Sequence, residues 1–107
     1  MDMCAGIDLQ YFKDEICSEL KGAICYIKIA MEIKAMDSSW SKSFAEMSSN
    51  ELYHATTLYK MFVEYCELIS KPYDDVPEYI LDMRNEVVDM YMEKSAKVKY
   101  MHEMYSK

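Results

Sequence analysis

The side chains in this sequence that are best suited to metal chemistry are a glutamate and a histidine three positions apart, Glu51 and His54. Residues at positions i and i+3 share one face of a helix, so the carboxylate and the imidazole would point the same way. Carboxylate and imidazole groups together are typical ligands of iron or manganese. Taken alone, the pair is also compatible with a solvated glutamate and a surface or core-edge histidine.

A further carboxylate, Glu19, lies among apolar neighbours in an earlier stretch, and Tyr26 follows it two helical turns later on the same face. In an antiparallel hairpin, residues at one height are about equally far from the turn. The midpoint between Glu19 and the Glu51/His54 pair falls near residue 36, where the sequence predicts a break between helices. We therefore expect Glu19, Glu51 and His54 to converge on one point. A bound metal would explain why costly buried carboxylates are tolerated there.

Three helical segments are predicted to position these groups, at about residues 8–35, 39–70 and 77–105. Within them, apolar residues recur every three or four positions, which is the pattern of an amphipathic helix. The chain holds only two glycines and two prolines, too few for a β protein with its frequent turns. The predicted fold is therefore all-α, with three long antiparallel helices in a single domain of residues 1–107.

Local signals predict how the helices begin and how closely they approach. The Asp-Ser-Ser run at 37–39 can cap the second helix, because a short polar side chain accepts a hydrogen bond from a first-turn N–H. Asp74 or Asp75 can cap the third helix, with Pro77 in its first turn. Gly22 interrupts the first segment at a cost of about 1 kcal/mol relative to alanine. It either permits a close helix contact or has no role.

The composition argues against several classes of function. A net charge of −7 at pH 7 and an isoelectric point near 4.7 argue against nucleic-acid binding and against docking on anionic membranes, since both need a basic face. No apolar run is long enough to span a membrane and no signal peptide is visible, so we expect a cytoplasmic protein. The four cysteines should then be reduced and inert. Most of the eleven methionines and ten tyrosines are expected to fill the core.

The two helices predicted to carry the metal-binding groups resemble the first helical hairpin of the ferritin-like superfamily. That superfamily includes ferritins, rubrerythrins and related di-iron or di-manganese carboxylate proteins. The resemblance rests on Glu19 followed by Tyr26, and on the run Glu51-Leu52-Tyr53-His54-Ala55 in the second helix. It covers residues 8–70 of the 107-residue chain.

The resemblance implies a role for each of these residues. Glu19 would be a terminal metal ligand, Glu51 would bridge two metals, and His54 would complete the coordination of one of them. Tyr26 would be the tyrosine near the site that hydrogen-bonds a ligand or takes part in electron transfer. The implied activity is that of a ferroxidase, which binds two Fe(II) ions and oxidises them with O2 or peroxide. Manganese is the other metal that such ligands accept.

The sequence departs from this family in its second half, where a four-helix bundle would supply another glutamate and another Glu-x-x-His. His102 does not repeat the motif, because Lys99 stands three residues before it. We expect two hairpins to pair about a two-fold axis and share one dimetal centre, as in the similar short encapsulated ferritins. The protein would then be a homodimer or a multiple of dimers. The alternative is that Glu86 or Glu93 of the third helix joins the site.

A second class of function is compatible with the missing half-site, namely a small helical scaffold or interaction protein that keeps the hairpin without metal. The two functions differ in how Glu19, Glu51 and His54 cooperate. If they bind metal, replacing any one by alanine abolishes binding and leaves the helices mostly intact. If they are structural, the same changes alter only stability, by about 1–3 kcal/mol.

Overall fold

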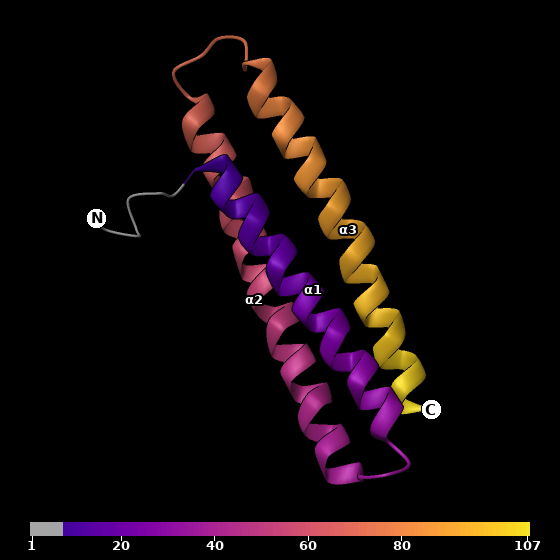
Figure 1. The fold of residues 1–107 in the computed structure, drawn as a ribbon. Helices are drawn as coiled ribbons and strands as arrows, with labels where there is room; N and C mark the ends of the chain where they lie inside the picture. The colour runs from indigo at the N-terminus through magenta and orange to yellow at the C-terminus, as the bar shows by residue number, and fades with distance from the viewer. Residues whose placement is uncertain (1–7) are drawn as a thin grey trace, which may run out of the picture.

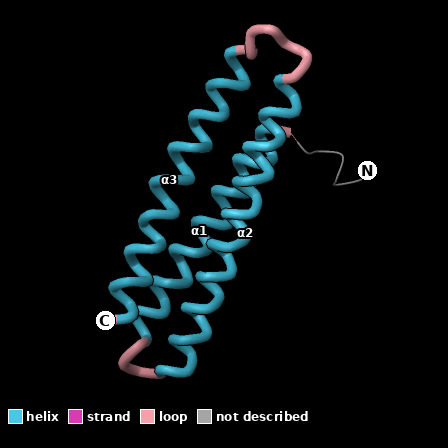
Figure 2. Tube along the Cα trace, turned by 180° about the vertical axis from the view of Figure 1, so that it is seen from behind, coloured by secondary structure: helices cyan, strands magenta, loops and turns pink. Residues whose placement is uncertain are grey.

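Three helices and no strand make up residues 8–107, the part of the chain that the computed structural model describes (Figure 1). They are α1 (Leu9–Ile33), α2 (Ser38–Ser70) and α3 (Glu78–Ser106). Each helix runs antiparallel to the next, so α3 ends beside the turn between α1 and α2 (Figure 2). The all-α class and the three predicted segments are confirmed to within two residues at each end. None of the three described helices is long and apolar enough to cross a membrane.

Aspartate side chains cap the first two helices. Asp8 Oδ1 accepts a hydrogen bond from the backbone N–H of Tyr11 at 2.8 Å, and Asp37 Oδ1 accepts one from that of Trp40 at 3.0 Å. These bonds satisfy first-turn N–H groups that have no partner within the helix. Asp37 is therefore the capping residue of the predicted 37–39 run, and its position fixes where α2 begins.

The predicted capping of α3 is wrong. Pro77 occupies the N-cap position without a side-chain hydrogen bond, and its carbonyl accepts the backbone N–H groups of Ile80 and Leu81. Asp74 and Asp75 lie too early in the chain to cap, because the helix starts only after Pro77. A proline is tolerated here, since it has no N–H that would need a partner at the helix start.

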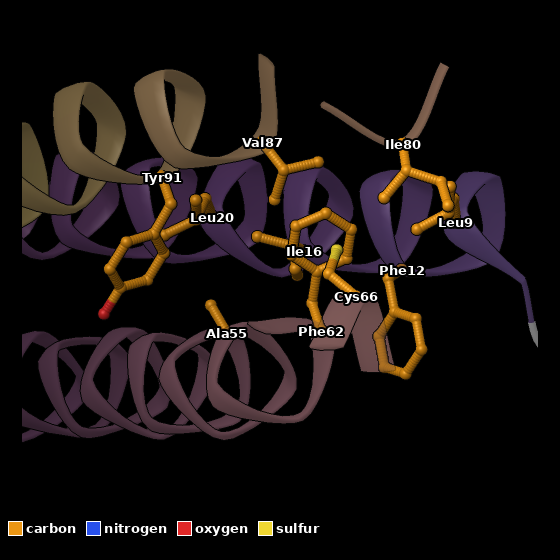
Figure 3. Close-up of a cluster of buried hydrophobic side chains, with 10 residues drawn as sticks. All are labelled: Leu9, Phe12, Ile16, Leu20, Ala55, Phe62, Cys66, Ile80, Val87 and Tyr91. Carbon is orange, nitrogen blue, oxygen red and sulfur yellow. The ribbon is translucent and has the colours of Figure 1, made fainter. Parts of the chain in front are cut away.

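α1 forms the middle of the core, because it packs against both other helices while α2 and α3 contact each other least. Its buried face consists of Leu9, Phe12, Ile16, Leu20, Ala23, Ile27 and Ala30, which recur every three or four residues, and Ile33 at the end of the same series is half-buried. Side chains from α2 and α3 reach this face from two sides (Figure 3): Phe62 and Cys66 from α2, and Ile80, Val87 and Tyr91 from α3. The apolar periodicity of the first segment thus predicted its buried face correctly.

α2 approaches α1 through small residues. Ser41, Ser48 and Ala55 are fully buried and stand seven residues apart, two helical turns each. Ser41 Oγ donates to the Ala30 carbonyl and Ser48 Oγ donates to the Ala23 carbonyl, both at 2.6 Å. The distance between packed helices depends on the side chains at the contact, so these short residues allow a close approach.

The expectation that most methionines and tyrosines fill the core is wrong. Among residues 8–107, Tyr91 is the one buried tyrosine, and no methionine is buried. Smaller residues occupy the interior of the α1–α2 contact, so the long side chains lie at its edges or in solvent. This leaves an unusual amount of flexible apolar surface on the molecule.

Hydroxyl groups of α2 also hold α3 in place. Each of three such hydroxyls contacts a polar group of α3 at 2.9 Å: Ser41 with the Tyr105 hydroxyl, Ser48 with His102 Nε2, and Thr56 with the Tyr91 hydroxyl. Each α2 hydroxyl already donates its only proton to a backbone carbonyl, so it accepts in these contacts. His102 therefore donates to Ser48 through Nε2–H.

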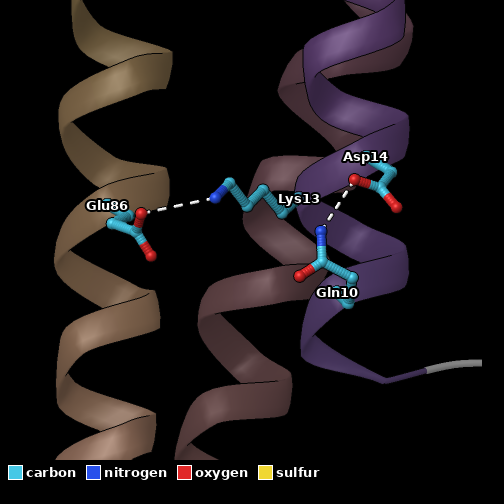
Figure 4. A network of polar contacts seen from close by, with 4 residues as sticks. All are labelled: Gln10, Lys13, Asp14 and Glu86. Carbon is cyan, nitrogen blue, oxygen red and sulfur yellow. Dashed lines mark hydrogen bonds and ion pairs between the residues drawn. The ribbon is translucent and has the colours of Figure 1, made fainter.

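An exposed ion pair links α1 to α3, with Lys13 Nζ 3.3 Å from Glu86 Oε1 (Figure 4). Nearby on α1, Gln10 Nε2 donates to Asp14 Oδ1 at 2.8 Å, one helical turn away. Both contacts are exposed, so the ion pair contributes at most about 1 kcal/mol to stability. Its main consequence is that Lys13 holds the Glu86 carboxylate on the α1–α3 side of the molecule.

The cysteines of the described range, Cys17, Cys25 and Cys66, are free thiols. Cys4 lies outside that range. Burial raises the pKa of the Cys66 thiol, because the thiolate is poorly solvated in the core. The Cys66 thiol is therefore protonated at neutral pH and behaves as a small apolar side chain.

His102 is expected to make the stability of the fold depend on pH. Burial lowers its pKa below the ordinary 6.5, because the imidazolium is poorly solvated there. The neutral form therefore stabilises the folded state fully above pH 6.5, and this contribution is lost as the pH falls through the lowered pKa. Urea unfolding at pH 7.5 and at pH 5.5 measures how much unfolding free energy is lost between these two pH values. This loss should be larger for the wild type than for His102→Gln, whose amide can still donate to Ser48. An equal loss in both proteins would contradict the expectation.

Candidate metal centre

Three side chains from α1 and α2 meet near the middle of the hairpin. The potential ligand atoms of Glu19, Glu51 and His54 all lie within 4.8 Å of one another. Glu19 comes from α1, and the other two come from the facing stretch of α2. The structure thus brings together the three residues that the midpoint of the predicted hairpin selected.

The carboxylate of Glu19 has one oxygen without a partner. Its Oε2 atom is buried and accepts no hydrogen bond. His54 Nδ1 lies 3.6 Å from this oxygen, which is beyond hydrogen-bond distance. A buried carboxylate oxygen without a donor costs free energy, and a bound cation would remove that cost.

The three groups fit a metal of the predicted kind. Two ligands bonded to one metal at about 2.1 Å can lie at most about 4.2 Å apart. The observed 4.8 Å limit is slightly larger, so binding one ion requires a small adjustment of the side chains, of which His54 is 57% exposed. Three donors leave further coordination positions open, so the group forms part of a coordination shell.

Gly22 makes room for the Glu51 carboxylate. A Cβ atom built on Gly22 would lie 3.4 Å from Glu51 Cδ and 3.5 Å from its Oε2. The carboxylate of α2 therefore rests directly against the backbone of α1, three residues after Glu19. Of the two alternatives for Gly22, the contact with Glu51 favours a close approach of the helices, although its link to the carboxylate was not predicted.

Tyr26 lies half-buried on α1, two turns from Glu19. Its ring is tilted against Phe44 of α2, with the ring centroids 6.1 Å apart. In the described part of the chain, its hydroxyl makes no hydrogen bond to Glu19, Glu51 or His54. The tyrosine is thus one layer away, where the spacing placed it, and its chemical role stays a prediction.

The acidic residues of α3 do not join the group. Glu86 forms the ion pair with Lys13, and Glu93 is exposed. Neither belongs to the one cluster of potential metal ligands found in residues 8–107. The structure therefore offers no support for completing the site within one chain.

α3 packs on the side of α2 that faces away from His54. Thr56 hydrogen-bonds to α3, and the Tyr59 ring stacks on Tyr91 with centroids 4.0 Å apart. At 100° per residue, these two α2 positions lie about 140–160° around the helix from His54. The face of the hairpin that carries the candidate metal centre is therefore not the face that α3 covers.

Comparison of the chain with family models, with curated proteins and with solved structures finds no match in any of the three. The resemblance to the ferritin-like superfamily thus rests on the spacing of Glu19, Tyr26, Glu51 and His54 in the sequence.

Substitutions of Gly22 should separate helix stability from metal binding. Gly22→Ala adds a Cβ at ordinary contact distance from Glu51, so it should raise stability by about 0.5–1 kcal/mol through helix propensity and keep metal binding. Gly22→Leu has similar helix propensity, but its side chain must displace the Glu51 carboxylate, so metal affinity should fall about 10–100-fold. Thermal unfolding and Mn(II) titration calorimetry measure the two effects. Equal affinity in both variants would show that Glu51 is not held as a ligand here.

Proposed function

We propose that this chain binds iron through Glu19, Glu51 and His54 as half of a ferritin-like di-iron centre. The observation that carries the proposal is the buried Glu19 oxygen without a partner, beside a second carboxylate and an imidazole. A purely structural buried glutamate is normally paired with a cation or a hydrogen-bond donor. A bound metal ion would supply the positive charge that is missing next to Glu19.

A second copy of the chain would complete the site. Three donor atoms are fewer than the six that carboxylate-bound iron or manganese commonly takes. A two-fold axis places identical residues opposite one another, so a pair of hairpins would surround two metal ions with two copies of Glu19, Glu51 and His54. Each chain would then provide half of a four-helix arrangement, and the site would hold one metal per chain.

The chemistry that iron supplies when bound is the loss of one electron from each Fe(II) to O2 or peroxide. The chain's own contribution is a set of fixed ligands: the carboxylates of Glu19 and Glu51 favour the more highly charged Fe(III), and His54 binds as a neutral imidazole. The net charge of −7 would raise the local concentration of cations, an effect that added salt weakens. Manganese is the second metal that the same ligands accept.

An anaerobic Fe(II) titration of the metal-free protein tests this function. We expect saturation at one iron per chain in a dimer, and an absorbing Fe(III) species once air is admitted. Glu19→Gln and Glu51→Gln should each abolish stoichiometric binding while the circular dichroism of the helices persists. Glu15→Gln is the matched control, because Glu15 lies one turn from Glu19 on α1 and outside the ligand cluster.

Two results would contradict the proposal in different ways. Two irons per monomer would place ligands of α3 in the site and exclude the shared centre. The absence of stoichiometric binding in a folded protein would exclude metal chemistry and favour a helical scaffold.

A further inference from the structure

α2 carries a second helical seam on the side that faces away from α3. Along it, residues recur at alternating intervals of four and three, the a/d pattern of a coiled coil. The members of this outer seam are Trp40, Phe44, Met47, Glu51, His54, Leu58, Met61, Tyr65 and Leu68. All of them are apolar or aromatic except the central pair, Glu51 and His54, which belong to the candidate metal centre.

One row of the outer seam is open to solvent. Trp40, Met47, Met61 and Leu68 are 66%, 40%, 49% and 58% exposed, and the His54 side chain at the middle of the row is 57% exposed. These five residues stand seven positions apart, so they form one row along α2 that drifts only about 20° around the helix per heptad. Exposed apolar residues grouped in this way on both sides of His54 mark an interaction surface.

The outer seam is symmetric about its polar centre. A two-fold axis perpendicular to α2, passing between Glu51 and His54, places residues equally distant from the axis opposite one another in two copies. Each half-buried seam residue of one copy then faces a residue of the exposed row in the other copy. The resulting layers pair Trp40 with Tyr65, Phe44 with Met61, Met47 with Leu58, and Glu51 with His54.

The two ends of the seam differ, because one carries an exposed large ring and the other is hollowed. Trp40 is exposed at one end, and at the other end is a hollow of about 310 Å³ lined by Phe12, Met61, Glu64, Tyr65 and Leu68. Trp40 and Tyr65 lie about 19 Å from the central layer in opposite directions along α2. An antiparallel pair therefore brings each indole to the other copy's hollow, whereas a parallel pair would set hollow against hollow.

The central layer also fixes the register of such a pair. A polar residue in a coiled-coil seam specifies alignment, because a shift would place it against apolar neighbours. Sliding one copy by a heptad would bury Glu51 against an apolar side chain and leave it without a partner. Only the symmetric register brings the two polar pairs together.

We propose that a second copy of this chain docks antiparallel on the outer seam, with Trp40 of each copy seated in the hollow beside Tyr65 of the other. The inference rests on the proposed shared metal centre, for which it names the partner and its direction. The apolar layers outnumber the polar one, so the pair forms without metal, and metal binding strengthens it.

Oligomer mass tests the docking surface. Sedimentation in EDTA should give a dimer for the wild type, and Met61→Asp should raise the dissociation constant at least about tenfold by placing a charge in the seam. Met92→Asp is the matched control, because Met92 is similarly exposed but lies on α3, and it should leave the dimer unchanged. A folded wild-type protein that stays monomeric, or equal effects of the two variants, would overturn the proposal.

Emission from Trp40 tests the direction of the pair, because the chain contains one tryptophan. Within one chain, Tyr65 lies about 37 Å from Trp40 along α2, so it affects the indole only from the other copy. Tyr65→Ala should shift the emission to longer wavelength and increase acrylamide quenching, whereas Tyr73→Ala, in the loop at the same end, should do neither. If the protein is a dimer and Tyr65→Ala changes neither the emission wavelength nor the quenching of Trp40, the antiparallel arrangement is overturned.

The ligand variants distinguish failure of the docking from failure of the metal site. Glu19→Gln should remain a dimer in EDTA, since Glu19 lies on α1 and outside the outer seam. A seam-dependent dimer without stoichiometric iron binding would uphold the docking and reject the proposed function. Iron binding to a protein that stays monomeric would reject the docking.

Discussion

The close approach of α1 and α2 is the constraint on which the rest of the structure depends. Ser41 and Ser48 donate to carbonyls of α1 at two heights one heptad apart, which fixes both the separation and the register of the helices. At this separation Gly22 faces the Glu51 carboxylate with no side chain between them. Glu19 is then held at the same height, with an oxygen too deeply placed to reach water. The cluster of acidic groups is a consequence of this packing.

The same constraint explains where the large side chains of α2 lie. Because small residues occupy its contact with α1, the bulky residues are displaced to the two flanks of the helix. One flank, with Thr56 and Tyr59, is covered by α3. The other flank carries Trp40, Met61 and the Glu51–His54 pair of the candidate metal centre, and α3 does not reach it. The small residues of α2 at its contact with α1 thus explain both the packing of the core and the exposed seam.

Local rules were sufficient to predict the helices, the buried face of the first helix in outline, and the grouping of the three candidate ligands. Asp37 marks the start of α2, and the hairpin turn then determines which acid of α1 lies level with His54. The inward side of α2 could not be predicted, because hydropathy favours the large apolar flank over the stripe of Ser41 and Ser48. Those hydroxyls are satisfied by carbonyls of another helix, and a contact between distant segments leaves no local pattern. The capping of α3 was predicted wrongly for a simpler reason: two aspartates precede Pro77, and only the backbone geometry shows which residue stands at the N-cap position.

The position of α3 limits how many chains can assemble. A bare two-helix hairpin has two faces, and if both were free, copies could stack on one another without end, as filaments do when contacts fail to close. Here α3 occupies one face within the same chain and uses Ser48, Thr56 and the apolar core to hold it. Only the face with the outer seam is left, so in the dimer proposed above an assembly through that face would be complete after one partner. The third helix, which adds no ligand to the candidate metal centre, would then prevent further chains from adding.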